Sequence, residues 1–366
     1  MKVLILTISA GQGHNKTARA LDEYLRSCSI DVEVVDTYKY FNTPLSNIVE
    51  KGYLLSTKFT PGIYGTIYSQ QEKKDHNNKL NFVDMIGKIV SKDFYEFIEE
   101  KNPDAIVATH VFAANLITKL KEKNNCSAKT YGIVTDFTAH PFWETVDLDY
   151  YVTPSAVLNN QMINKGIPEE KILPFGIPIE SKFSQATEKT DARKALGIED
   201  KMTVFVMTGS MGYGDVLKYV QDLDEVPYDF QIIIVCGNNA SLKEQIDQLN
   251  TRKEIYNYGF VDNVDVIMDA SDVIVSKPGG LTVSEALAKK LPMIIIDPIP
   301  GQEERNREFL INNGLAISVS ENVSVGEAMY QLITGEKRIE CMKIMADEIG
   351  SPLSSKLLGD FIIANK

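Results

Sequence analysis

Cysteine is scarce in this sequence and follows no spacing of a known site. Only four cysteines occur in 366 residues, at positions 28, 126, 236 and 341. No two form a Cys-x-x-Cys pair, and none has a histidine at the spacing that zinc sites use. A disulfide framework and a structural zinc site are therefore not expected. We expect reduced thiols in the interior of a cytoplasmic protein.

Long apolar runs and positive charge are also lacking. No hydrophobic stretch approaches the roughly 20 residues that span a bilayer, and residues 1–6 lead directly into a strand instead of a signal peptide. Any membrane contact is therefore expected to be peripheral. The net charge of −12 argues against a general nucleic-acid binder, because phosphate backbones repel an acidic surface.

Apolar strands alternate with helical patterns through most of the chain. With 44% hydrophobic and 24% charged residues, the composition is that of a soluble globular protein. The length exceeds one typical core, so two domains are expected. The pattern predicts two doubly wound α/β domains facing a central cleft, at 1–183 and 184–345, and a helix within 346–366 that packs back on the first domain.

The N-terminal strand, loop and helix carry the first candidate site. An apolar strand at 3–8 runs into a glycine loop at 9–15 that contains Gly13 and His14, and a helical pattern follows. A dinucleotide fingerprint would need a glycine where Lys16 stands, so the match to that motif is only partial. His14 is a candidate functional residue, although a lone histidine in such a loop is often polar filler.

Residues 43–92 interrupt this alternation. The stretch is rich in tyrosine, phenylalanine and isoleucine, and its lysines outnumber its acidic residues in a chain that is acidic overall. This composition is typical of a surface that meets anionic lipid. A helical pair that packs its aromatic side chains inward and solvates its lysines would have the same composition. The sequence leaves both interpretations open.

Asp136 follows a predicted strand at 130–134, much as His14 follows the first strand. Ligands of open α/β sheets gather at the carboxyl ends of the strands, so both side chains could face one crevice. Asp at a strand end is also common as a turn or N-cap residue. The position alone does not separate these roles.

The most informative stretch is 276–286 in the second half. It follows a short apolar strand at 272–275, and its glycine pair, Gly279 and Gly280, opens a helical pattern. A glycine pair at a helix start lets backbone N–H groups approach an anion closely. The same residues also fit a simple turn with a capping box, in which Thr282 pairs with Glu285.

Two further turns resemble this arrangement. A second glycine loop at 208–214 follows the predicted strand 203–207, and the pair of loops suggests that a diphosphate binds in this half. Another turn, at 300–306, follows the strand 292–297 and opens a helix. Its acidic residues could equally complement the dipole of a first helical turn.

These motifs, in this order and over nearly the full length, resemble the monogalactosyldiacylglycerol synthase and processive diacylglycerol glucosyltransferase family. That family has the two-domain inverting glycosyltransferase fold called GT-B. The resemblance implies that Asp136 is the catalytic base and that His14 is the rival base or orients the substrates. The donor contacts that it implies, together with the glycine turns, are Gly13, Gly209, Ser210, Met211, Phe260, Val261, Lys277, Gly279, Gly280, Thr282, Glu285, Gln302, Glu303 and Asn306.

The implied reaction transfers a hexose from a UDP-sugar to diacylglycerol at the cytoplasmic face of the cell membrane. The Lys277-containing motif is closer to bacterial glucosyltransferases, so glucose is favoured over galactose. The expected partners are the UDP-sugar, diacylglycerol and an anionic membrane surface, without nucleic acid. No metal or other cofactor is expected, because a helix N-terminus can replace the cation. Alternatives are a galactosyltransferase, an N-acetylglucosaminyltransferase of peptidoglycan precursors, a UDP-sugar 2-epimerase, and a non-enzymatic nucleotide-sugar binder.

Overall fold

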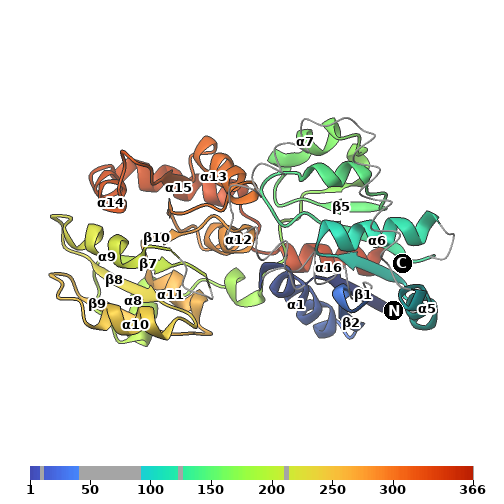
Figure 1. Cartoon of the computed structure of the whole chain (residues 1–366), viewed down its shortest axis with the longest axis horizontal. Coiled ribbons are helices and arrows are strands. Elements are labelled where there is room, and N and C mark those ends of the chain that lie inside the picture. The colour runs from blue at the N-terminus through green and yellow to red at the C-terminus, as the bar shows by residue number, and fades with distance from the viewer. Residues whose placement is uncertain (9–11, 41–91, 123–126, 210–213, 366) are drawn as a thin grey trace. The chain divides into compact units, whose positions relative to one another are not determined.

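The computed structural model describes residues 1–8, 12–40, 92–122, 127–209 and 214–365 (Figure 1). The stretch 43–91, with its predicted lipid-facing surface, lies outside these ranges. Two units result from the packing of the chain. Unit 1 comprises Met1–Ser181, Ile299–Arg305 and Leu353–Lys366, and unit 2 comprises Lys182–Pro298 and Asn306–Pro352. The predicted boundary at 183/184 lies two residues from the first of these divisions.

Unit 1 is built on a six-stranded, fully parallel sheet with the order β2-β1-β3-β4-β5-β6. Its central strands are short, apolar and buried on both faces, which is typical of a sheet covered by helices on each side. The strands are β1 (Lys2–Thr7), β2 (Asp31–Asp36), β3 (Ala105–Ala108), β4 (Lys129–Ile133), β5 (Tyr150–Val152) and β6 (Ile172–Leu173).

Helices cover both faces of this sheet and create two apolar cores. One core lies under α5 and α6, and the other lies between the sheet and α1 with α16. The α-helices are α1 (Gln12–Ser27), α5 (Lys92–Lys101), α6 (Val111–Glu122), α7 (Asn159–Asn164) and α16 (Ser354–Ala364). The 3₁₀ turns are η1 (Thr37–Tyr40), η2 (Pro141–Thr145), η3 (Ala156–Leu158), η4 (Glu169–Lys171) and η5 (Ser181–Ser184).

The C-terminal helix α16 is part of unit 1 and lies beside α1 (Figure 1). Its residues Leu358 and Ile362 are completely buried in the core that α1 shares. The two helices approach so closely that a Cβ atom at Gly359 would lie 2.3 Å from Cδ1 of Tyr24. Glycine at this position therefore permits the contact between the helices.

Unit 2 repeats the architecture with a second six-stranded parallel sheet, in the order β12-β11-β10-β7-β8-β9. The strands are β7 (Thr203–Met207), β8 (Gln231–Val235), β9 (Ile255–Tyr258), β10 (Val273–Ser276), β11 (Met293–Ile295) and β12 (Ala316–Ser318). The helices are α8 (Lys189–Leu196), α9 (Val216–Asp224), α10 (Ala240–Asp247), α11 (Val264–Ala270), α12 (Gly280–Ala288), α13 (Gln302–Asn312), α14 (Val325–Thr334) and α15 (Glu336–Ile349). The first residues of α13, up to Arg305, belong to unit 1.

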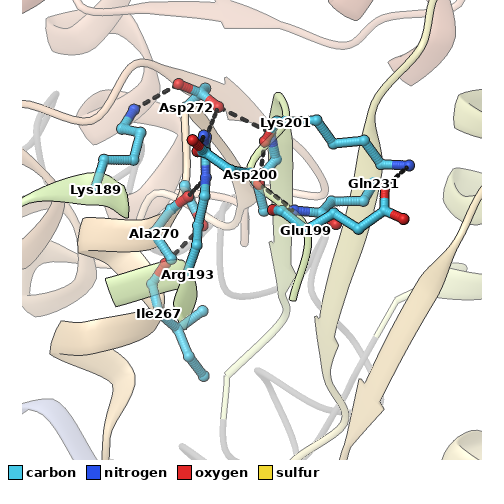
Figure 2. Close-up of polar contacts among 11 residues, drawn as sticks. Lys189, Arg193, Glu199, Asp200, Lys201, Gln231, Ile267, Ala270 and Asp272 are labelled. Carbon is cyan, nitrogen blue, oxygen red and sulfur yellow. Dashed lines mark hydrogen bonds and ion pairs between the residues drawn. The ribbon is translucent and has the colours of Figure 1, made fainter. Parts of the chain in front are cut away.

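A buried arginine connects α8 to the strand that precedes the glycine pair (Figure 2). The guanidinium of Arg193 donates to Asp272 at 2.7 Å and to Asp200 at 2.8 Å, and its Nε donates to the carbonyl of Ala270 at 3.1 Å. The same carboxylate oxygen of Asp272 accepts the backbone N–H of Thr203 at 2.8 Å. Asp272 thereby joins the starts of β10 and β7, which are neighbours in the sheet.

The expectation of interior thiols is correct for only one of the described cysteines. Cys236 is buried at the end of β8, whereas Cys28 and Cys341 are exposed. Cys28 directly follows α1, and Cys341 lies on the outer face of α15, so neither reaches a core. Cys126 lies outside the described ranges.

Candidate active site

The candidate site in unit 1 lies where the order of the strands reverses, between β1 and β3. Successive strands run outward in opposite directions from such a point, and the loops that leave them open a crevice at the carboxyl edge. Residues 9–11 of the predicted glycine loop are outside the described ranges. Gly13 lies in the first turn of α1, and a Cβ there would meet no described atom within 4 Å. The surrounding protein therefore does not require glycine at this position.

His14 is held by two oxygen atoms that come from neighbouring strand ends. Its Nδ1 lies 2.9 Å from the carbonyl oxygen of Thr109 and 3.2 Å from the hydroxyl of Thr135. A carbonyl can only accept a hydrogen bond, so Nδ1 carries the proton and the neutral ring has its lone pair on Nε2. Burial lowers the pKa of His14, while the bond to Thr109 opposes that shift, so the ring is neutral near pH 7.

Two further histidines of this region did not emerge as candidates from the sequence. His110 packs edge-on against His14, with ring centroids 4.6 Å apart. Its Nδ1 accepts the backbone N–H of Phe112 at 3.1 Å, and Nδ1 of His140 accepts that of Phe142 at the same distance. Burial lowers the pKa of His110 well below its usual value and that of His140 to about 3. His110 is the second residue after β3, and a position near the carboxyl end of a strand is a sequence signal for a functional residue.

Asp136 and Gln302 are brought together in unit 1. Asp136 follows β4, and its Oδ2 accepts a hydrogen bond of 3.0 Å from Nε2 of Gln302, the first residue of α13. A predicted sugar-binding amide thus contacts a predicted base, although 166 positions separate them in sequence. Asp136 is half-buried, so its carboxylate is accessible to solvent or substrate.

The turn before α13 is held by its own acidic residues. Oε2 of Glu303 accepts the backbone N–H of Ile299 at 2.8 Å, and Oε2 of Glu304 accepts that of Gly301 at 3.0 Å. Gly301 has a φ of +100°, which favours glycine. Both carboxylates therefore support the start of the helix. The predicted contact of Glu303 with sugar hydroxyls stays a prediction.

In unit 2 the strand order reverses between β7 and β10, and both predicted glycine loops leave the sheet there. Gly209 follows β7 with a φ of +81°, a conformation that favours glycine. The predicted nucleotide contacts Ser210 and Met211 lie outside the described ranges. A cavity of about 210 Å³ lies between the starts of α9 and α10 and includes Gly214 and Asn239 in its lining.

The glycine pair opens α12, as the sequence indicated, but the capping box is wrong. Gly279 is the N-cap and Gly280 the first helical residue, so Thr282 lies inside the helix and does not cap it. Glycine has no side chain to occupy the first-turn N–H groups, which are thus placed to receive an anion. Gly279 supplies the extended N-cap backbone (φ −67°, ψ 136°), so the helix begins two residues before Thr282.

Two polar residues beside this helix start are buried. The side chain of Glu285, in the second turn of α12, is 4% exposed. Nδ2 of Asn306 is completely buried and donates to the carbonyl of Pro278 at 2.9 Å. Asn306 therefore ties α13 to the loop that precedes α12, and its predicted contact with the sugar stays a prediction. Lys277, in the same loop, is half-buried.

The remaining predicted contacts are Phe260 and Val261, which follow β9. This strand lies at one edge of the sheet, separated from β10 by β7 and β8. Phe260 is 61% exposed, and its predicted contact with the uracil stays a prediction. In the described ranges, no three His, Cys, Asp or Glu side chains are grouped closely enough to hold a metal ion. No helix in those ranges is long and apolar enough to cross a bilayer.

Two doubly wound parallel sheets, each with its loops gathered at a reversal of strand order, define a GT-B fold. Solved structures agree. The chain matches the crystal structure of MurG from Acinetobacter baumannii with a TM-score of 0.62 at 14% identity, over 99% of both chains. It also matches a UDP-GlcNAc 2-epimerase from Neisseria meningitidis bound to UDP-GlcNAc with a TM-score of 0.61 at 16% identity, over the full length of both. These likenesses establish the fold alone.

Comparison with known protein families shows which GT-B proteins the two units resemble. Residues 14–179 match the monogalactosyldiacylglycerol (MGDG) synthase family, and residues 203–348 match the glycosyltransferase family 28 C-terminal domain. Over these two regions the chain is similar to the MGDG synthase family and to the family 28 glycosyltransferases, respectively.

The curated relatives carry names from the same family. The processive diacylglycerol beta-glucosyltransferase of Bacillus pumilus (strain SAFR-032) is 29% identical, with 93% of this chain and 89% of the relative covered. The protein of the same name from Bacillus cereus (strain AH187) is 28% identical, with 99% and 93% covered.

Proposed function

We propose that this protein transfers a hexose, with glucose favoured, from a UDP-sugar to the hydroxyl of diacylglycerol and inverts the anomeric carbon. The observation that carries the proposal is the pairing of an MGDG synthase unit with a family 28 C-terminal unit in one chain. Both similar proteins from Bacillus are named as diacylglycerol glucosyltransferases and align over nearly the whole length. The product is a β-glycosyldiacylglycerol, a membrane glycolipid.

The donor half of the reaction is assigned to unit 2. The departing UDP gains negative charge as the bond between the sugar and the phosphate breaks. The first-turn N–H groups of α12, behind Gly279 and Gly280, are suited to stabilise that charge. Glu285 lies in the next turn and is assigned to the ribose hydroxyls. Ribose hydroxyls can donate hydrogen bonds to a carboxylate.

The acceptor half needs a base that removes the proton of the lipid hydroxyl while its oxygen bonds to the anomeric carbon. The sequence favoured Asp136, with His14 as the rival. The geometry supports His14 more strongly, because its neutral ring has a lone pair on Nε2, which makes no hydrogen bond with any described residue. Asp136 instead accepts a hydrogen bond from Gln302, which suits a residue that orients the sugar and the acceptor.

A labelling assay tests the proposal. The protein is incubated with radiolabelled UDP-glucose or UDP-galactose and diacylglycerol, and the label in the organic phase is counted. We expect label from UDP-glucose, and the same rate with a chelator, because helix N-terminal N–H groups replace a cation. Label that stays in the aqueous phase as an epimerised UDP-sugar would favour the epimerase, whose fold is equally similar. Label only from UDP-galactose would identify the galactosyltransferase.

Two variants identify the base. His14→Gln should lower turnover by roughly 10²–10⁴, the usual contribution of a general base, while UDP affinity is unchanged. Asp136→Asn should cost less, because an asparagine keeps the shape and a hydrogen-bonding oxygen at that position. If Asp136→Asn is the more damaging change, the sequence-based assignment is correct and ours is wrong.

Peripheral binding to an anionic membrane at the cytoplasmic face completes the proposal. Diacylglycerol resides in a bilayer, and the basic, aromatic stretch 43–92 has the composition of a lipid-facing surface. Each lysine near anionic lipid contributes about 1 kcal/mol, and salt screens that attraction. Vesicle co-sedimentation should therefore need anionic lipid, weaken at high salt, and disappear when Lys73, Lys74 and Lys79 are replaced by glutamate. Normal sedimentation of that triple variant would place the docking surface elsewhere.

A further inference from the structure

The carboxyl edge of the sheet in unit 1 carries a row of threonines. Each of four neighbouring strands has a threonine at its carboxyl end. In sheet order these are Thr37 after β2, Thr7 as the last residue of β1, Thr109 after β3 and Thr135 two residues after β4. The first three are buried, with exposures of 0%, 4% and 0%. Four adjacent strands thus present a hydroxyl at the same edge, directly beside the start of α1.

Hydrogen bonds connect this row to the start of α1. The hydroxyl of Thr37 donates to the carbonyl of Thr7 at 3.0 Å, and that of Thr109 donates to the hydroxyl of Thr7 at 3.1 Å. The hydroxyl of Thr7 then donates to Oδ1 of Asn15 at 2.9 Å. Asn15 is the residue after His14, so the row fixes the backbone from which the imidazole projects.

Thr135 completes the row at the ring itself. Since Nδ1 of His14 already carries a proton for the carbonyl of Thr109, the hydroxyl of Thr135 must accept from the same N–H, at 3.2 Å. The Thr109 acceptor is a backbone carbonyl, which every residue type provides. Of the two acceptors, only the Thr135 hydroxyl can therefore be removed by a substitution. Edge-on packing of His110 at 4.6 Å limits rotation of the ring.

We propose that Thr135 is a positioning residue that, with the Thr109 carbonyl, holds His14 in the Nδ1–H tautomer and so keeps the basic lone pair on Nε2. The tautomer itself does not depend on the proposed function, but the role of Nε2 as the catalytic base rests on it. In a catalytic triad, a carboxylate accepts the hydrogen bond from the histidine, and its negative charge stabilises the protonated ring. Here two neutral oxygens set the tautomer, so the ring stays neutral and able to accept a proton at neutral pH.

The neighbouring histidines provide an internal comparison. His110 and His140 accept backbone N–H groups on Nδ1, so their neutral rings carry the proton on Nε2. The structure therefore predicts opposite tautomers for His14 and for these two residues. The chain has only four histidines, with His76 as the fourth, so the ring nitrogens can be assigned one by one.

The direct test is long-range ¹H–¹⁵N spectroscopy of protein labelled with ¹⁵N-histidine, with signals assigned from single His→Asn variants. We expect the Nδ1–H pattern for His14 and the Nε2–H pattern for His110 and His140 at neutral pH. In Thr135→Val, which removes the hydroxyl but keeps the shape, a second His14 signal from the Nε2–H tautomer should appear. Thr135→Ser should restore the single pattern.

Kinetics provide the second readout. Thr135→Val should lower kcat about fivefold, as expected for the loss of one hydrogen bond, with KM for the UDP-sugar unchanged, and Thr135→Ser should recover most of the rate. Thr130→Val is the matched control, because Thr130 is a buried threonine at the opposite end of β4 whose hydroxyl bonds to Asp149. It should alter neither the His14 signal nor kcat.

Two results would overturn the proposal. One is an Nε2–H pattern for His14 in the unaltered protein. The other is a Thr135→Val variant that matches the unaltered protein in both its His14 spectrum and its kcat. The spectra need no substrate, so the tautomer can be established even if the labelling assay finds no transfer, and failure of the proposed function would then be recognised separately.

Discussion

At the scale of single residues, the candidate site contains three histidines that hold their neutral form to a lower pH than a surface histidine does. His14, His110 and His140 all have a pKa below the usual value, and burial is the main cause for each. Lys165 and Arg305 add positive charge near His140 and lower its pKa further. These rings enter the fold without a proton, which links the stability of unit 1 to pH.

The sign of this link follows from the two pKa values of His140. Its pKa is 6.5 in the unfolded chain and about 3 in the folded one, so between these values only the unfolded state binds the proton. The stability of unit 1 should be complete above pH 6.5 and fall as the pH drops toward 3. His140→Asn keeps an acceptor that can cap η2 and does not titrate, so its unfolding free energy should depend less on pH.

Denaturant unfolding of both proteins at several pH values between 4 and 7 measures the effect. Parallel curves for His140→Asn and the unaltered protein would mean that folding does not lower the pKa of His140.

The second prediction at this scale concerns Glu285. Glu285→Gln keeps the size of the buried side chain but removes its charge, so hydrogen bonds from ribose hydroxyls become weaker. We expect UDP to bind about tenfold more weakly by calorimetry, which is typical of losing a charged hydrogen bond. Glu340→Gln, on the exposed face of α15, is the control and should bind UDP normally. Unchanged affinity in a folded Glu285→Gln variant would leave that carboxylate without a role in the donor site.

At the scale of elements, the strands were the most predictable part. The strand predicted at 203–207 agrees with the structure at both ends, and those predicted at 3–8 and 130–134 differ from it by one residue at each end. Strands of a covered parallel sheet must be short and apolar on both faces, so they stand out against the polar loops. Helix starts were less predictable. The capping box at Thr282 failed because a glycine N-cap leaves no side-chain signal in the sequence.

The site was predictable only where it is local. The loops of His14, Asp136 and Gly279 could be identified because each follows its own strand. Contacts between distant elements could not be, because strand order and register decide them. The bond from Gln302 to Asp136 and the tautomers of the histidines both depend on such contacts.

The buried ion pair that joins α8 to β10 yields a prediction for elements. Arg193→Met would leave the half-buried carboxylate of Asp272 with Lys189 and the backbone N–H of Thr203 as partners, and the loss of the charged hydrogen bond should destabilise unit 2 by about 2 kcal/mol. Arg252→Met is the matched control, because Arg252 is mostly exposed and 3.7 Å from Asp224, so its loss should cost at most about 1 kcal/mol. Hydrogen exchange of the β10 amides reports on unit 2 specifically. Equal effects of the two variants would contradict the proposed importance of burial.

At the scale of the whole molecule, unit 1 is assembled from three separate segments of the chain. The contact between α1 and α16 joins the first and last of them, and it tolerates no side chain at Gly359. Gly359→Ala should force the helices apart and destabilise unit 1 by about 1–3 kcal/mol, the usual cost of overpacking. Thermal unfolding measures the change.

Gly13→Ala is the control for that variant, because a methyl group there meets no described atom within 4 Å. It should be as stable as the unaltered protein or more stable by up to about 1 kcal/mol, because alanine at a compatible position reduces the entropy of the unfolded chain. A Gly359→Ala variant as stable as Gly13→Ala would show that Tyr24 moves aside at little cost.

The position of α16 in the sequence also affects how unit 1 folds during synthesis. A ribosome that adds roughly 5–20 residues per second completes β1 and α1 early, but α16 emerges only after all of unit 2 has been translated. For a period on the order of half a minute, the apolar residues of α1 that pack against α16 have been synthesised but α16 has not, so they lack their partner helix. The packing of α16 against α1 is therefore the last step in the folding of unit 1.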